Sequence, residues 1–175
     1  QQTIPDQKSY SPEELEQFSQ QAECRQLLFV CNQYLGKTLS SSEIETLLYF
    51  YDQLHFSADL IEYLVEYCVC KGSKSIHYIR KVGLAWAEDG ISTVSQAKER
   101  TTTYRRNTFA IMKAFGINDR NPVDPELKYI EKWLDAYDFT LELFLEACRR
   151  TMERLHKPNF EYADRILQRW SDQHV

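Results

Sequence analysis

Aromatic and basic side chains recur at a fixed spacing near the C-terminus of this 175-residue chain. Tyr162, Ile166 and Trp170 stand at positions i, i+4 and i+8. Because a helix has about 3.6 residues per turn, these three side chains share one helical face. Arg165 and Arg169 border the tyrosine side of that face. Since aromatic rings stack on nucleobases while cations neutralise phosphates, the pattern indicates a candidate nucleic-acid interface.

The same face has a second interpretation, which is core packing. Ala163 and Leu167 extend it into a broad apolar surface of the kind that ordinary helices bury. The two interpretations are compatible, because tyrosine and tryptophan rings can pack one edge and present the other to solvent. The spacing alone leaves both open.

The pattern occurs a second time, 84 positions upstream, as Tyr78, Val82 and Trp86. Lys81 takes the place of Arg165, so a tyrosine with a basic neighbour recurs at the rim of each face. At an offset of 83 positions, seven apolar residues of the upstream flank align with seven of the downstream flank: Ile44, Leu47, Tyr51, Leu54, Phe56, Leu60 and Ile61 with Leu127, Ile130, Leu134, Tyr137, Phe139, Leu143 and Phe144. We therefore predict two tandem helical repeats, residues 11–92 and 93–175, that share a long helix over residues 93–115.

The periodicity predicts an all-α protein of eight helices without a sheet. Glycine and proline are scarce, with five of each, and apolar residues recur close to every 3.6 positions. The sequence Ser11-Pro12-Glu13-Glu14 is typical of a helix start, and we expect that helix to run to about residue 35. Further helices are expected over about 40–54, 57–72, 78–90, 93–115 and 140–156, with one more after the loop of residues 118–124 and a final motif helix after residues 157–159. Gly36 and Gly116 stand where glycine ends a helix.

The chain has a net charge of −5, but its charged side chains are distributed unevenly along the sequence. Residues 1–70 carry 3 basic and 11 acidic side chains, whereas residues 71–113 carry 9 basic and 3 acidic ones. The basic block contains the first motif and the shared helix, which favours them as the main phosphate-binding track, with Arg165 and Arg169 as a secondary site. The residues we predict to contact nucleic acid in this block are Lys74, Tyr78, Arg80, Lys81, Trp86, Arg105 and Arg106.

A second basic stretch, Arg149-Arg150-x3-Arg154-x2-Lys157, ends the helix before the last motif. It fits either a favourable interaction with the helix dipole or a phosphate-facing surface. The sequence leaves both interpretations open.

Enzymatic and metal chemistry find little support in the sequence. Cys68, Cys70 and His77 lack the CxxC or HxxxH spacing of metal sites, and no glycine-rich phosphate loop or nucleophile–base pattern occurs. The other cysteines, Cys24, Cys31 and Cys148, fall with Cys68 at core positions of helices, which favours a reducing compartment, the cytoplasm. No apolar run reaches the ~18 residues of a membrane span. We expect no catalytic residues, no cofactor and no metal.

The duplicated motif resembles the DnaD/DnaB-type replication-initiation domain of Firmicutes and their phages. Phe139-Thr140-x-Glu142-Leu143 and the turn Trp86-Ala87-Glu88-Asp89-Gly90-Ile91 add to the resemblance. It implies an all-helical primosome module that remodels origin DNA, binds single strands partly through this motif and helps to deliver the helicase. The implied contacts are Tyr78, Val82 and Trp86, and then Tyr162, Ile166 and Trp170, with Val82 replacing the usual isoleucine. The family's winged-helix domain is not found before Ser11, nor its basic tail after Trp170, and the polar, aperiodic start suggests a piece of a longer protein.

Two functions are compatible with these features. The first is a non-enzymatic accessory module of replication initiation that binds DNA, preferably single-stranded, and assists helicase loading. The second is an interaction or oligomerisation scaffold of the replication machinery without direct DNA binding. The expected partners are DNA, replication initiator or helicase-loader proteins, and a second copy of the chain.

Overall fold

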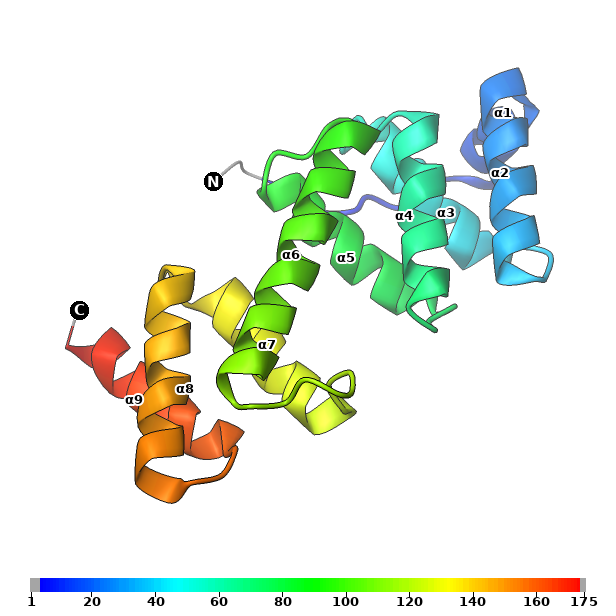
Figure 1. The fold of residues 1–175 in the computed structure, drawn as a ribbon. Coiled ribbons are helices and arrows are strands. Elements are labelled where there is room, and N and C mark those ends of the chain that lie inside the picture. Colours follow the sequence, from blue (N-terminus) through cyan, green and yellow to red (C-terminus); the bar gives the residue numbers. More distant parts are fainter. Residues whose placement is uncertain (1–3, 174–175) are drawn as a thin grey trace. The chain divides into compact units, whose positions relative to one another are not determined.

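The computed structural model describes residues 4–173, which form nine helices and no strand (Figure 1). This confirms the all-α prediction. The helices are α1 (Pro12–Gln20), α2 (Ala22–Leu35), α3 (Ser41–Asp52), α4 (Ala58–Cys70), α5 (Ile76–Glu88), α6 (Val94–Ala114), α7 (Asp124–Ala136), α8 (Leu141–Leu155) and α9 (Phe160–Asp172). The chain divides into two compact units between Glu99 and Arg100, within α6. We call them unit 1 and unit 2.

The first predicted helix was wrong in one respect, because the structure breaks it at Gln21. Ser11 and Glu14 form a reciprocal capping box that starts α1 as expected. Gln21 is extended, with φ −67° and ψ 136°, and α2 begins after it. Phe18 and Cys24 are both buried, although six residues at about 100° each would turn them to different sides of one continuous helix. The break lets both side chains enter the core.

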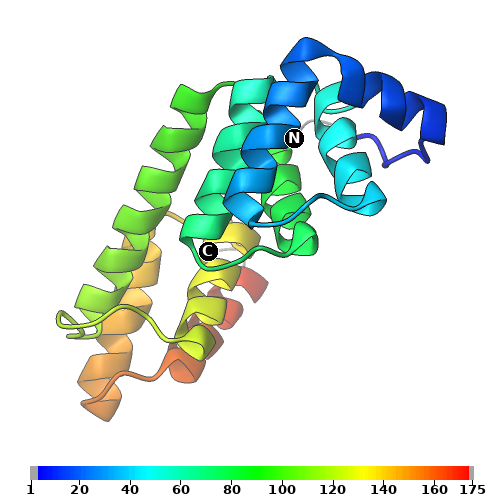
Figure 2. The ribbon, with the colours of Figure 1, turned by 90° about the vertical axis from the view of Figure 1, so that its right-hand side faces the viewer.

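Unit 1 is built around α4. This helix packs along α2 and also contacts α3 and α5, and Figure 2 shows α2 and α4 side by side. Ser40 and Ser57 cap α3 and α4 by accepting hydrogen bonds from the backbone N–H groups of Glu43 and Leu60. The enclosed core is continuous and apolar, and its largest fully buried members are Leu27, Leu47, Tyr49, Phe50, Leu60, Ile61, Leu64, Ile79 and Trp86.

Unit 2 is built around α9, which packs against α7 and α8. Its core contains Ile111 and Phe115 from α6, Ile130 and Trp133 from α7, and Phe144, Phe160 and Leu167 from the last two helices. Asn159 caps α9 by accepting a hydrogen bond from the backbone N–H of Tyr162. The Trp133 indole N–H donates to the Asp164 carboxylate at 3.0 Å, which fixes the position of α9 on α7.

Helices α3 and α5 approach each other closely at Gly83. A Cβ atom at this position would lie 2.8 Å from the Phe50 ring and 3.0 Å from the Leu64 side chain. Phe50 cannot yield easily, since it is fully buried and stacked on Phe56 with ring centroids 5.7 Å apart. The absence of a side chain at Gly83 therefore allows the two helices to pack.

We expect Gly83→Ala to lower the free energy of unfolding by about 1–2 kcal/mol. Overpacking costs about 1–3 kcal/mol, and the better helix propensity of alanine returns up to about 1 kcal/mol. Urea unfolding followed by circular dichroism measures the change. In a Phe50→Leu background the same substitution should cost less, because the obstructing ring is gone. An unchanged cost in that background would show that the ring contact is not the cause.

Candidate nucleic-acid interface

The first motif lies on α5 and contributes mainly to the core of unit 1. Trp86 is fully buried between Tyr63 and Tyr67 of α4, with a ring-centroid distance of 5.8 Å to each. Its indole N–H has no hydrogen-bond acceptor among the described residues. Tyr78 and Val82 are half-buried against the same core. The Trp86 ring is therefore enclosed by protein in this fold and has no face open to a base.

The second motif lies on α9, and its tryptophan has a different environment. The buried residues of α9 are Phe160, Ala163 and Leu167, whereas Ile166 and Trp170 are only partly buried against the core of unit 2. The Arg150 guanidinium of α8 lies over the Trp170 ring, 5.1 Å from the ring centroid. Trp170 thus keeps solvent access at the edge of the apolar face, and Tyr162 is likewise half-buried.

The predicted repeat alignment explains why the two tryptophans differ. Its offset of 83 positions pairs Tyr63 with Glu146 and Tyr67 with Arg150. Two rings that enclose Trp86 in unit 1 are therefore replaced in unit 2 by an ion pair, in which the Arg150 Nε donates to Glu146 at 3.1 Å. A flexible charged pair covers a tryptophan less completely than two packed rings do.

The predicted cations of unit 1 differ in availability. Lys74 and Lys81 are exposed. Arg80 is half-buried, because its Nε donates to the Gln7 side chain at 3.0 Å and its guanidinium lies 5.7 Å from the centre of the Tyr49 ring. Arg80 therefore ties α5 to α3 and to the N-terminal segment.

The cations beside the second motif also differ. Arg165 is exposed but is paired with Glu161 one turn earlier, with 2.6 Å between nitrogen and oxygen. Arg169 is exposed and forms no ion pair within the described part of the chain. Of this pair, Arg169 is the freer charge.

Within unit 2, the exposed side of α6 combines three cations with an aromatic ring. Arg105, Arg106 and Lys113 are exposed, and none forms an ion pair among residues 4–173. Phe109 lies between them along the helix and is 62% exposed, which is unusual for a phenylalanine. We call Arg105, Arg106, Phe109 and Lys113 the α6 face. Because no acidic residue occurs from Arg100 to Lys113, this face is cationic throughout.

Sequence reasoning found Arg105 and Arg106 but missed Phe109 and Lys113. Phe109 precedes the buried Met112 by one helical turn, so its apolar character fits the core pattern of α6. The available signal was its position four residues after Arg105 and four before Lys113, a ring between cations on one face. Only the packing of α6 shows that the ring points to solvent.

Residues 4–173 contain neither a metal-ligand cluster nor a reactive cysteine among their buried thiols. No group of three or more His, Cys, Asp or Glu side chains there could hold a metal ion. Cys24, Cys31, Cys68 and Cys148 are buried, as predicted, and burial raises the pKa of the Cys31, Cys68 and Cys148 thiols to about 12. Such thiols are protonated and unreactive at neutral pH. No helix among the described residues is long and apolar enough to cross a membrane.

Comparison with known proteins places this arrangement in a family. A family model described as "Replication initiation and membrane attachment" matches residues 28–101 and 116–175, which is most of the chain. The chain belongs to this family. Each matched segment contains one of the two motif helices, α5 or α9, as expected of two copies of one domain. The resemblance seen in the sequence is thereby confirmed for this replication-initiation family.

One curated protein aligns with about half of the chain. The "Replicative helicase loading/DNA remodeling protein DnaD" of Bacillus subtilis (strain 168) is 31% identical over 86 residues, which are 49% of this chain and 37% of that protein. The alignment therefore spans little more than a third of the relative's length. No solved structure shows significant similarity to the chain.

Proposed function

We propose that this chain is an accessory module of replication initiation that binds DNA, preferably single-stranded, and assists helicase loading without enzymatic activity. Family membership and the name of the Bacillus subtilis relative support the role in replication. The observation that supports DNA binding is the α6 face, where three exposed cations that form no ion pair within residues 4–173 surround an exposed ring. In this proposal the protein partners are initiator or helicase-loading proteins, or a second copy of the chain.

The chemistry of the α6 face suits a nucleic-acid strand. From Arg105 to Lys113 the helix rises about 12 Å, so the cations can neutralise successive phosphates along a backbone. Phe109 offers a free ring face at the centre of the cations. Base stacking on such a ring requires an unpaired base, because duplex bases are already stacked on one another. This requirement favours single strands over duplex DNA.

The motif helices have secondary roles in this proposal. Trp170 and Tyr162 retain solvent access, and with Arg169 they offer a further ring-and-cation contact in unit 2. In unit 1, the exposed Lys74 and Lys81 supply charge beside the half-buried Tyr78, while Trp86 and Val82 support α5 from the core side. We also propose that the two units are tandem copies of one domain whose motif tryptophans have diverged.

Replacing Phe109 by alanine should weaken binding to a fluorescent oligothymidine by about tenfold. The loss reflects one stacked base, which contributes roughly 1–3 kcal/mol. Fluorescence anisotropy at fixed salt measures the affinity. Phe29→Ala is the matched control. Phe29 is 61% exposed on α2, but it does not lie among three exposed cations as Phe109 does. We expect the control to bind like the parent chain.

The alternative function, a scaffold without DNA affinity, gives a different result in the same assay. A salt titration of the parent chain should give a linear decrease of log K with log salt concentration if phosphates are bound. Absence of binding at low salt would refute the proposal and favour the scaffold. Equal losses from Phe109→Ala and Phe29→Ala would refute the assignment to the α6 face.

A further inference from the structure

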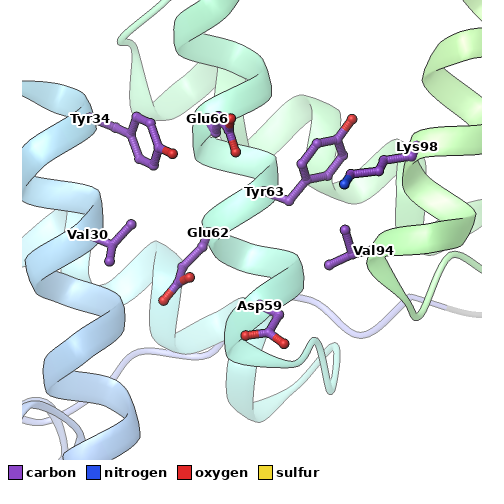
Figure 3. Close-up of a pocket in the computed structure, with 8 residues that line it drawn as sticks. All are labelled: Val30, Tyr34, Asp59, Glu62, Tyr63, Glu66, Val94 and Lys98. Atoms are coloured by element: carbon purple, nitrogen blue, oxygen red, sulfur yellow. The ribbon is translucent and has the colours of Figure 1, made fainter.

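A groove runs along α4 in unit 1, on the side opposite to the core. Figure 3 shows it between α2, which contributes Val30 and Tyr34, and the first turns of α6, which contribute Val94 and Lys98. Its volume is about 400 Å³, enough for one or two long side chains. All of its lining residues belong to unit 1. The groove is therefore a feature of that unit alone.

Three carboxylates form the centre of the groove. Asp59, Glu62 and Glu66 stand at i, i+3 and i+7 of α4, which places them along one helical face. None of them forms an ion pair within the described part of the chain. Burial, with a further contribution from Asp59, raises the pKa of the Glu62 carboxyl. The groove thus has three carboxylates against the single lysine, Lys98, that also lines it.

Two tyrosines add aromatic walls to these carboxylates. Burial and the neighbouring Glu66 carboxylate raise the pKa of the Tyr34 phenol, which α2 contributes to the groove. Tyr63 presents its ring on the α6 side, where the Lys98 Nζ lies 5.7 Å from the ring centroid. That contact shows that a cation can be accommodated against this wall. Rings and carboxylates together are the groups that bind guanidinium or ammonium ions.

The predicted repeat alignment differs between the two units at three of the groove positions. Leu145 replaces Glu62, Glu146 replaces Tyr63 and Arg149 replaces Glu66, whereas Glu142 keeps the acidic character of Asp59. Each of the two helices directly precedes the motif helix of its unit in the chain. In this alignment, the Glu62, Tyr63 and Glu66 combination on α4 is not repeated on α8.

We propose that this groove binds arginine or lysine side chains on a helical segment of a protein partner. Charge complementarity selects the chemistry, since three carboxylates with a single lysine repel a phosphate backbone and attract cations. Adjacent turns of a partner helix can present cations at the same spacing as the carboxylates. In a second copy of the chain, Arg149 and Arg150 are paired with Glu146, but the α6 face offers exposed cations, so self-association is a separate outcome of the test. The proposal is independent of DNA binding by the α6 face.

The test is a peptide-binding measurement without DNA. The probe is a fluorescein-labelled, alanine-based helical peptide with arginines at i, i+3 and i+7, and the reference probe has glutamine at those positions. We expect the full chain to bind the arginine peptide at least about tenfold more tightly than the glutamine peptide. The variant Glu62→Gln/Glu66→Gln should lose most of that difference. Its matched control, Glu13→Gln/Glu16→Gln, removes two exposed charges from α1 of the same unit and should keep it.

A second variant separates the groove from general acidity. Tyr34→Leu leaves every charge in place but removes an aromatic wall, and it should weaken the arginine peptide several-fold. Circular dichroism confirms that each variant is folded. The proposal is overturned if the parent chain does not distinguish the two peptides, or if the α1 control loses as much affinity as the groove variant. Association of the chain with itself that the groove variant abolishes would also overturn it, in favour of a second copy as the occupant.

Discussion

Replacing Trp86 by alanine is expected to lower the free energy of unfolding by about 3–5 kcal/mol, whereas Trp170→Ala should cost only about 1–2 kcal/mol. The difference follows from burial, because Trp86 is enclosed by Tyr63 and Tyr67 while Trp170 is covered on one side by Arg150. Alanine at position 86 would leave a large cavity that two packed helices cannot close. Urea unfolding with circular dichroism detection measures both losses.

The two tryptophans belong to different compact units, so the comparison needs a signal from each unit. A full thermal or urea curve should show the transition of unit 1 shifted by Trp86→Ala and that of unit 2 shifted by Trp170→Ala. The Trp170 substitution should also weaken DNA binding modestly if the ring contacts a base. Similar stability losses from both substitutions would mean that Arg150 shields its tryptophan as completely as two tyrosines do, which contradicts our account of the divergence.

Substituting both Arg105 and Arg106 by glutamine should reduce single-strand affinity by on the order of tenfold or more at low salt. If each arginine binds one phosphate, the slope of log K against log salt should become shallower by about 1.4, at about 0.7 per contact for single strands. The reason is that these arginines have no acidic partner in the described structure, so their charge is available to phosphate. Anisotropy titrations at several salt concentrations measure both quantities.

Arg149→Gln/Arg150→Gln is the matched control for that experiment. It removes the same charge from another adjacent arginine pair in the same unit, but both of these arginines are engaged by Glu146 at 2.9 and 3.1 Å. We expect a smaller loss of affinity and a nearly unchanged slope. If the control is as harmful as the Arg105/Arg106 change, the whole basic surface of unit 2 attracts DNA and the α6 face has no special role.

Local signals were enough to predict much of the fold. Serine at positions 11, 40 and 57 caps the helices that follow it, and Gly36 ends α2 in the left-handed conformation with φ 70°. Such signals depend on a few adjacent residues and on backbone geometry, so they can be read without knowledge of the tertiary structure. The break at Gln21 has no glycine or proline to mark it, and it was missed.

The sequence by itself determined the all-α class and the two motif helices, and its repeated spacing predicted that the two units are copies of one domain. It also determined which residues share a helical face, because helical periodicity depends only on spacing. Only the tertiary structure decided which of those faces is covered. Trp86 is buried and Trp170 is not, because the neighbouring helix supplies tyrosines in one unit and a glutamate–arginine pair in the other. Phe109 is exposed for the same kind of reason: α6 is packed through Ile111, Met112 and Phe115, which turns the Phe109 ring and its flanking cations toward solvent.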